Sequence, residues 1–254
     1  MTDADLLALA TRLARSAAEA ILSVRAAGFA VEQKTDMSPV TAADRLAEGI
    51  ILEGLRAATP DIPVVAEEEC SAGAIPRVGG RFWSVDPLDG TREFAAGREE
   101  FTVNIGLVVE GRPHLGAVAL PAFGEVFTGI VGQGAWKLDA GGQRPIAARR
   151  APEEGITVFA SRHYAGDPRL AEFLKGRRVA KVHEIGSAVK FCRLAEGLGD
   201  LYPRFGRTME WDTAAPEAVL VAAGGRCTAM DGITPLAYGK PGWENPPFLC
   251  QGQA

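Results

Sequence analysis

The chain begins with two segments in which apolar residues recur at helical spacing. Residues 3–27 form the first, and its apolar face consists of Leu6, Ala10, Leu13, Ala17, Ile21 and Val24. This pattern predicts an amphipathic helix that stops at Gly28. After a polar segment, a second helix is expected from about Thr41 to Arg56, with Leu46, Ile50 and Leu55 on one face.

Short runs of apolar and β-branched residues follow, and they predict strands. A strand at 62–66 ends in three glutamates, and another at 82–85 is ended by Asp86-Pro87. Four more are expected at 102–109, 114–120, 125–131 and 135–138. Because their separators are short and turn-like, these strands predict a largely antiparallel meander behind two helices.

The rhythm changes after residues 140–145, which form the best boundary between two halves. Strands are then expected at 157–160, 178–182 and 200–205, and helices at 187–196 and 213–223. Such alternation favours an α/β layer. We therefore expect an N-terminal α+β half, residues 1–145, and a C-terminal α/β half, residues 146–254, packed as layers of helices and sheets.

The composition excludes several classes of protein. Hydrophobic residues make up 47% of the 254 residues and charged residues 23%, which argues against a disordered chain. The sequence has no apolar run of about 18 residues, so no membrane span is expected. The acidic start at residues 1–5 lacks the features of a secretory signal. We therefore expect a cytoplasmic protein.

Charge and cysteine content limit which partners and sites are expected. A net charge of −5 argues against duplex nucleic acid as a partner, although this net charge is compatible with a small basic pocket. The four cysteines lack the spacing of a disulfide framework, and we expect reduced, buried thiols. The three histidines are too scattered for a zinc site.

The candidate chemistry begins where the strand at 82–85 runs into Asp86-Pro87-Leu88-Asp89-Gly90-Thr91. A turn at Pro87 can aim both carboxylates at one point and leave the Leu88 carbonyl unpaired. These oxygen ligands suit Mg2+, and a helix starting at Gly90-Thr91 would attract phosphate. The alternative is a proline turn in which Asp89 caps the helix.

Other carboxylates lie near predicted element ends. Glu67-Glu68-Glu69 end the strand before Asp86, and adjacent strand ends would gather negative charge that a metal ion relieves; the alternative is a solvated acidic loop. Asp212 precedes an apolar helical run, where it could also be an N-cap. Asp44 follows Thr41, where it could complete a capping box.

These segments together resemble the signatures of the inositol monophosphatase superfamily, whose members are Mg2+-dependent, lithium-sensitive phosphomonoesterases. The matching segments are Val-Thr-Ala-Ala-Asp at 40–44, Glu-Glu at 67–68, Trp-Ser-Val-Asp-Pro-Leu-Asp-Gly-Thr at 83–91 and Trp-Asp-Thr-Ala-Ala at 211–215. They occur in the family's order and spacing. The resemblance implies a layered αβαβα sandwich of the inositol monophosphatase and sugar phosphatase type.

Further segments resemble the 3′(2′),5′-bisphosphate nucleotidase branch. They are Thr-Arg-Glu-Phe at 91–94, Gly-Ser-Ala-Val-Lys-Phe-Cys at 186–192, Asp-Leu-Tyr-Pro-Arg-Phe-Gly at 200–206, Tyr-Gly-Lys at 238–240 and Asn-Pro at 245–246. The inositol branch tends to place a glutamate near Arg204, whereas Arg204 would attract a second phosphate. The chain departs from the branch's usual Gly-Ser-Ser-Leu-Lys at Ala188 and Val189, which removes one hydroxyl.

The resemblance also implies roles for individual residues. Two or three Mg2+ ions would be held by Glu67, Asp86, Asp89, Asp212 and the Leu88 carbonyl. Thr91, polarised by Asp44, would orient the attacking water with assistance from Glu67, and the N–H groups of Gly90 and Thr91 would bind the scissile phosphate. The remaining substrate contacts would be Lys34, Ser187, Lys190 and Arg204. The alternative for Lys34 is a solvated loop lysine, and for Ser187 and Lys190 a helix cap beside an exposed lysine.

The function implied is hydrolysis of a small phosphorylated substrate. The branch removes the 3′-phosphate of adenosine 3′,5′-bisphosphate to give AMP, and the sulfated precursor 3′-phosphoadenylyl sulfate is a further candidate, which places the enzyme in sulfur metabolism. The alternatives are an inositol monophosphatase, a broad sugar phosphatase, and a non-catalytic phosphate-binding module on the same fold. The sequence leaves the oligomeric state open.

Overall fold

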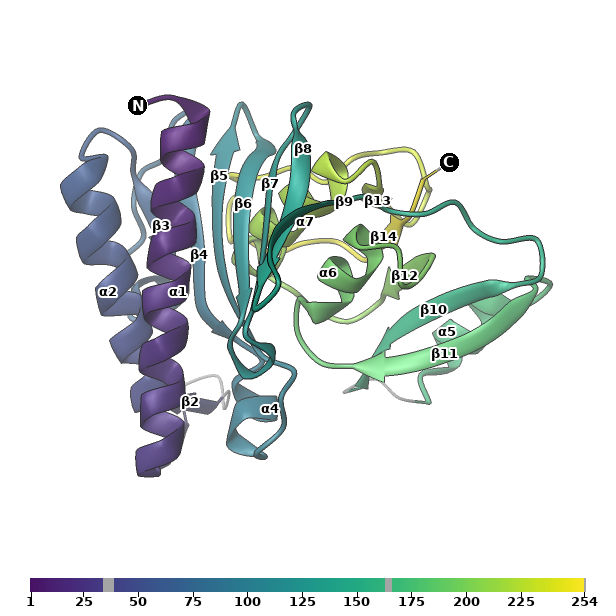
Figure 1. Cartoon of the computed structure of the whole chain (residues 1–254), viewed down its shortest axis with the longest axis horizontal. Helices are drawn as coiled ribbons and strands as arrows, with labels where there is room; N and C mark the ends of the chain where they lie inside the picture. The colour runs from purple at the N-terminus through teal and green to yellow at the C-terminus, as the bar shows by residue number, and fades with distance from the viewer. Residues whose placement is uncertain (34–38, 163–165, 254) are drawn as a thin grey trace.

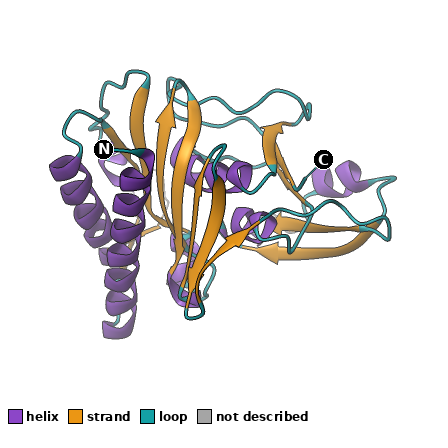
Figure 2. Cartoon of the chain, turned by 45° about the horizontal axis from the view of Figure 1, so that its top comes forward, coloured by secondary structure: helices purple, strands orange, loops and turns teal. Residues whose placement is uncertain are grey.

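The computed structural model describes residues 1–33, 39–162 and 166–253, and its elements stack in layers (Figure 1). A helix pair, a seven-stranded sheet, two further helices, a five-stranded sheet and one outer helix follow one another across the molecule. Figure 2 shows the first helix pair on one side of the large sheet and other helices on its far side. This order confirms the expected αβαβα sandwich.

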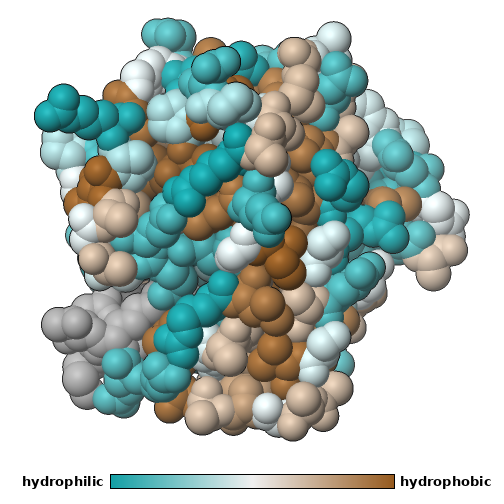
Figure 3. All heavy atoms as spheres, turned by 90° about the vertical axis from the view of Figure 1, so that its left-hand side faces the viewer, coloured by the Kyte–Doolittle hydropathy of each residue, from teal (hydrophilic) through white to brown (hydrophobic). Residues whose placement is uncertain are grey.

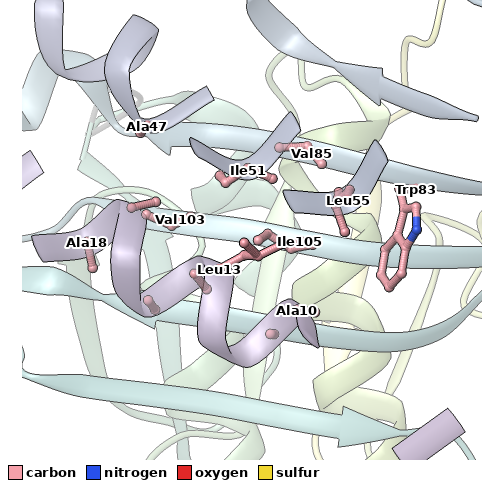
Figure 4. Packing of buried hydrophobic residues seen from close by; sticks show 14 of the residues in the cluster. Ala10, Leu13, Ala18, Ala47, Ile51, Leu55, Trp83, Val85, Val103 and Ile105 are labelled. Carbon is pink, nitrogen blue, oxygen red and sulfur yellow. The ribbon is translucent and has the colours of Figure 1, made fainter. Parts of the chain in front are cut away.

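The first layer consists of α1, Asp3–Ala27, and α2, Ala42–Ala58. Each helix starts with a capping box, formed by Thr2 with Asp5 in α1 and by Thr41 with Asp44 in α2. Figure 4 shows side chains of both helices packed against residues of the large sheet, among them Trp83, Val85, Val103 and Ile105. On the side of the molecule shown in Figure 3, hydrophilic and hydrophobic residues are interspersed.

The buried face of α2 differs from the expected one. Leu46 is 47% exposed, and the buried residues are Ala43, Asp44, Ala47, Glu48, Ile51, Leu52 and Leu55. The expected face was chosen from the large apolar residues, on the assumption that every carboxylate faces solvent. Here two carboxylates face inward because they have polar partners there, so the buried face of the helix is rotated from the expected one.

The large sheet is the predicted meander. Its order is β3-β4-β5-β6-β7-β8-β9, with β3 parallel to β4 and all other neighbours antiparallel. The strands are β3 Val64–Ala66, β4 Arg81–Asp89, β5 Thr102–Val109, β6 Arg112–Leu120, β7 Glu125–Ile130, β8 Gly134–Asp139 and β9 Gly142–Ile146. Strand β9 occupies most of the segment expected as a boundary, because Asp139 to Gly142 form a hairpin turn. The division of the chain at residue 145 stays a prediction.

Short elements connect these layers. They are β1 Val31–Gln33 and β2 Pro39–Thr41, which pair antiparallel, and α3 Glu67–Ser71, α4 Thr91–Ala95 and η1 Pro121–Phe123. None of the helices in the three described ranges is long and apolar enough to cross a membrane.

The second sheet has the order β11-β10-β12-β14-β13. Strand β10 is parallel to both neighbours, whereas β14 is antiparallel to β12 and β13. The strands are β10 Ile156–Ser161, β11 Val179–Ile185, β12 Leu201–Arg204, β13 Arg226–Ala229 and β14 Phe248–Gln251. Helix α5, Pro168–Leu174, packs on this sheet through Phe173 and Leu174. The sequence pattern did not predict α5, β13 or β14.

Helices α6, Val189–Ala195, and α7, Ala214–Ala222, fill the space between the sheets. Helix α7 lies on a row of glycines, because Gly106, Gly116 and Gly129 stand opposite one another on β5, β6 and β7. A Cβ atom on Gly116 would lie 2.2 Å from the Ala215 carbonyl oxygen. The absence of side chains on this row therefore lets the start of α7 rest directly on the sheet backbone.

Candidate active site

The parallel strands β3 and β4 bring Glu67 and Asp86 to the same sheet edge. Ala66 pairs with Val85, so the next residue of each strand continues at that edge. Burial raises the pKa of Asp86, and the negative charge of the nearby Glu67 raises it further. The meeting of strand ends expected from the sequence is therefore present, although residues 67–71 form the short helix α3 rather than a loop.

The segment Asp86–Asp89 differs from the expected turn in two respects. Strand β4 does not stop at Asp86 but continues to Asp89, with a shift of register against β5 between those residues. Inside the irregularity, the Leu88 N–H donates to Asp86 Oδ1 at 3.0 Å. The Leu88 carbonyl is not unpaired, because the Thr91 hydroxyl lies 3.1 Å from it.

Gly90 turns the chain from β4 into α4. Its φ of 95° lies in the left-handed region, and a Cβ atom there would lie 3.0 Å from the Glu100 carbonyl oxygen. Both observations require glycine. Asp89 makes no side-chain cap to α4; instead it accepts the Ala188 N–H at 2.6 Å. The alternative interpretation of Asp89 as the cap of this helix is therefore wrong.

Thr91 and Asp44 meet across the helix and sheet layers. The Thr91 hydroxyl lies 3.0 Å from Asp44 Oδ1, while Asp44 Oδ2 accepts the Thr41 N–H and hydroxyl, each at 2.7 Å. The capping box and the contact with Thr91 thus coexist. Burial raises the pKa of Asp44. Since a hydroxyl has one proton, Thr91 donates to either Asp44 or the Leu88 carbonyl at a given moment.

Asp212 ends the 3-10 helix η3, Glu210–Asp212, just before α7. Its Oδ2 accepts the Met209 N–H at 2.9 Å, and the N-cap of α7 is Thr213. The interpretation of Asp212 as the N-cap of the following helix is therefore wrong. Its backbone position is set by η3 and by the contact of α7 with the glycine row.

Two residues that sequence reasoning missed hold this segment. Glu210 is fully buried and accepts the N–H groups of Gly239 and Lys240, at 2.6 and 2.9 Å, and the Lys240 ammonium at 2.7 Å. Asn245 Nδ2 donates to the Met209 carbonyl at 2.8 Å and to the Thr213 hydroxyl at 2.9 Å. The signal available in the sequence was the matching of 238–240 and 245–246 to the family branch.

The carboxylates in this region raise one another's pKa values. The pKa of Asp86 lies well above its ordinary value because of burial and the charges of Glu67, Asp89 and Asp212. Burial, followed by the charge of Asp89, also raises the pKa of Asp212. Burial raises the pKa of Asp89, although Lys190 opposes the shift. A divalent cation bound among these groups would favour their ionised forms and offset the repulsion between them.

The donor set fits a hard cation. Carboxylate and carbonyl oxygens are the ligands that Mg2+ takes in proteins, and here they are concentrated enough to repel one another. Within the described ranges, no three acidic, histidine or cysteine side chains are already grouped to hold a metal ion. The fit is therefore one of chemistry and location, and ligation requires the side chains to turn toward a common centre.

Cationic groups lie close to these acids. Lys190 is 2% exposed, so the interpretation as an exposed lysine is wrong. Its ammonium donates to the Ile185 carbonyl at 3.1 Å and also to the Ser187 carbonyl. Burial, followed by the charge of Arg204, lowers the pKa of Lys190 to about 7. The Arg204 guanidinium donates to the carbonyls of Gly206, at 3.2 Å, and Arg207, at 3.0 Å.

Ser187 lines a cavity at this site. Its hydroxyl accepts the Val189 N–H at 3.3 Å, but the N-cap of α6 is Ala188. That cavity has a volume of about 670 Å³, within the range of small-molecule sites. The predicted residues that line it are Glu67, Asp89, Gly90, Thr91, Ser187, Lys190, Arg204 and Asp212.

Three predicted residues of the described ranges do not line the cavity. Asp44, Asp86 and Leu88 are each 1% exposed, and Asp44 and the Leu88 carbonyl contact Thr91, which does line it. Lys34 lies outside the described residues. The structure thus brings acidic and cationic side chains from segments far apart in the sequence to one cavity.

Fold and site together define a class of phosphatase. The family model of the inositol monophosphatase family matches residues 3–247, and the chain belongs to this family. Among its curated relatives, the 3′(2′),5′-bisphosphate nucleotidase CysQ of Salmonella typhimurium is 43% identical over 239 residues, which cover 93% of this chain and 96% of the relative.

Solved structures agree with this membership. The crystal structure of CysQ from Bacteroides thetaiotaomicron is similar, with a TM-score of 0.82 and 32% identity, and the match covers 98% of each chain. The inositol monophosphatase from Anabaena has a TM-score of 0.78 and 29% identity, over 98% of this chain and 91% of that one.

Proposed function

We propose that this chain is a 3′(2′),5′-bisphosphate nucleotidase, a phosphoric monoester hydrolase that removes the 3′-phosphate of adenosine 3′,5′-bisphosphate to yield AMP. The observation that carries the proposal is that acidic and cationic side chains line one cavity. A substrate with two phosphates can place the scissile one at the acids, with their metal, and the other at Lys190 and Arg204. The relatives named CysQ support the same assignment.

The acidic residues of the cavity region would hold two or three Mg2+ ions. The groups that would hold it are the carboxylates of Glu67, Asp86, Asp89 and Asp212 and the Leu88 carbonyl. When bound, Mg2+ supplies Lewis acidity to the phosphoryl group and lowers the pKa of the attacking water. The binding free energy is favoured because the cation offsets repulsion among acids that raise one another's pKa values.

The chain's own residues orient the reaction. When the Thr91 hydroxyl donates to Asp44 Oδ1, its oxygen can accept a hydrogen bond from the attacking water. Burial of Asp44 keeps this arrangement away from bulk water. Glu67 lines the cavity beside Thr91 and would assist in accepting the proton of that water. The N–H groups of Gly90 and Thr91, at the start of α4, would bind the scissile phosphate.

The second phosphate and the sugar would contact Arg204, Lys190 and Ser187. Arg204 presents a planar guanidinium suited to phosphate oxygens, and Lys190 and Ser187 lie beside it in the cavity lining. Lys34 stays a predicted contact. Use of 3′-phosphoadenylyl sulfate, which carries the same 3′-phosphate and an additional sulfate, and a cytoplasmic location also belong to the proposal.

The decisive experiment is a substrate panel with Mg2+ titration. The purified chain, stripped of metal with EDTA, is supplied with Mg2+ and with adenosine 3′,5′-bisphosphate, 3′-phosphoadenylyl sulfate, inositol 1-phosphate or AMP, and phosphate release is measured. We expect Mg2+-dependent release, fastest from the bisphosphate nucleotide.

The same panel separates the alternatives. Faster release from inositol 1-phosphate than from the nucleotide would favour an inositol monophosphatase, to whose Anabaena member the fold is similar, and comparable release from many phosphates a broad sugar phosphatase. Binding without turnover of any substrate would indicate a non-catalytic phosphate-binding module.

A further inference from the structure

Helix α2 carries two buried carboxylates one helical turn apart. Asp44 is 1% exposed and Glu48 is 5% exposed, and a spacing of four residues places them on the same face. Asp44 contacts Thr91, whereas Glu48 contacts the backbone of α3. One helix therefore reaches both of the segments that carry Thr91 and Glu67.

The contacts of Glu48 end on the first turn of α3. Its Oε2 accepts the Glu68 N–H at 2.9 Å, and its Oε1 accepts the Glu69 N–H at 3.0 Å. Helix α3 has five residues, and its N-cap Ala66 makes no side-chain hydrogen bond. Because the first N–H groups of a helix lack partners within it and so short a helix is unstable alone, Glu48 supplies the cap that α3 lacks.

A carboxylate at this position is electrostatically unfavourable. Helix α3 begins with Glu67, Glu68 and Glu69, whose negative charges repel that of Glu48. A hydroxyl or carboxamide could cap the helix without adding charge, but each offers a single acceptor oxygen. Only a carboxylate offers each of the two N–H groups an acceptor oxygen of its own. The charge is therefore tolerated where two-point fixation of the α3 backbone is needed.

The residue beside this fixed backbone is Glu67. On its other side, Ala66 is held by pairing with Val85, so the chain at Glu67 is restrained from both directions. Glu67 lines the cavity, whereas Glu48 does not. We propose that Glu48 is a positioning residue, which fixes the start of α3 so that the Glu67 carboxylate faces Asp86 and the Mg2+ site. The inference rests on the proposed function of that site.

The test measures Mg2+ binding to the full chain without substrate. In Glu48→Gln, one acceptor oxygen becomes an NH2 group that faces a backbone N–H. We expect the Mg2+ affinity, measured by calorimetry, to fall by about 10- to 100-fold, as for residues that orient metal ligands. The Mg2+ concentration for half-maximal phosphate release should rise by the same factor, while turnover at saturating Mg2+ stays close to that of the wild type.

The matched control is Glu53→Gln, which removes a charge from the exposed face of the same helix and should leave Mg2+ affinity unchanged. A double substitution adds a second criterion. Because Glu48 acts through Glu67, adding Glu48→Gln to Glu67→Gln should cause no further loss of affinity. An additive loss would overturn the proposal.

Other outcomes are equally decisive. If Glu48→Gln has a lower melting temperature in EDTA but an unchanged Mg2+ affinity, Glu48 acts only as a helix cap, and the inference is overturned. If Glu48→Gln does not fold, Glu48→Asp, which keeps the charge but shortens the side chain, provides the same comparison. A wild-type chain that binds Mg2+ but releases no phosphate from the nucleotide would contradict the proposed function alone, because calorimetry needs no substrate.

Discussion

Gly116 on β6 lies so close to Ala215 on α7 that a Cβ atom on Gly116 would come within 2.2 Å of the Ala215 carbonyl oxygen. Gly106, its neighbour in register, would place a Cβ atom 2.7 Å from the Ala215 backbone nitrogen. Since only Thr213 separates Asp212 from α7, we expect this contact to set the distance between Asp212 and the strand that carries Asp86.

Gly116→Ala should therefore displace α7. We expect unfolding free energy to fall by about 1–3 kcal/mol, because the clash is with backbone atoms that cannot change rotamer, and the Mg2+ requirement for turnover to rise. Denaturant unfolding and Mg2+ titration measure the two effects. Gly49→Ala is the control, since a Cβ atom there meets nothing within 4 Å and alanine favours its helix. Equal stability of the two variants would contradict the contact.

Asp86→Asn should separate metal binding from folding. The change removes one charge from a cluster of repelling carboxylates, so stability in EDTA should equal or exceed that of the wild type. Turnover should fall by more than about 100-fold, because a ligand is lost, and added Mg2+ should no longer raise the melting temperature. Asp61→Asn, on the exposed turn before β3, should behave as wild type. Retained Mg2+-dependent turnover in Asp86→Asn would show that the ligand set is wrong.

Glu217 makes stability depend on pH. Burial raises the pKa of Glu217 from 4.5 to about 8, and its carboxyl group meets the Tyr238 hydroxyl. A carboxyl whose pKa is raised by folding stabilises the protein fully below pH 4.5 and progressively less as pH rises toward 8. The slope reaches at most about 1.4 kcal/mol per pH unit.

Glu217→Gln should remove this part of the pH dependence, because an amide does not ionise. Unfolding free energies measured across that range should show a flatter profile for Glu217→Gln than for the wild type. The exposed Glu154→Gln should keep the wild-type profile. Identical slopes for wild type and Glu217→Gln would mean that Glu217 is ionised in the folded protein.

Arg204 should distinguish substrates by their number of phosphates. For Arg204→Ala we expect the KM of adenosine 3′,5′-bisphosphate to rise by about 10- to 100-fold, the effect of losing a hydrogen bond between charged groups. The KM of inositol 1-phosphate, which has no second phosphate, serves as the internal control and should change little. Equal losses on both substrates would indicate that Arg204 acts by holding the carbonyls of Gly206 and Arg207.

Lithium should inhibit the enzyme, as the family resemblance implies. Li+ is a small, hard cation that takes oxygen ligands but carries half the charge of Mg2+, so it can occupy a carboxylate site without activating the phosphoryl group. Phosphate release should fall with millimolar LiCl and be unaffected by the same concentration of KCl. Full activity in both salts would contradict the prediction.

Local sequence patterns determined the elements whose signals are local. The apolar spacing and capping residues of α1, the alternation of short strands and turns in the meander, and the strand that leads into Asp86-Pro87-Leu88-Asp89 all follow from neighbouring residues. The candidate acids could also be predicted, because they occur at element ends in a recognisable order. Their roles stay predictions.

Only the tertiary structure decided which polar residues are buried and what they meet. The inward turn of Glu48 and the hydrogen bonds of Glu210 with residues 239 and 240 each depend on partners distant in the sequence. Strand β9 forms because it pairs with the free edge of β8. The packing role of Gly106, Gly116 and Gly129 becomes apparent only when three strands align beneath α7. In each case the deciding free energy comes from a contact between segments, and no pattern within one segment can encode it.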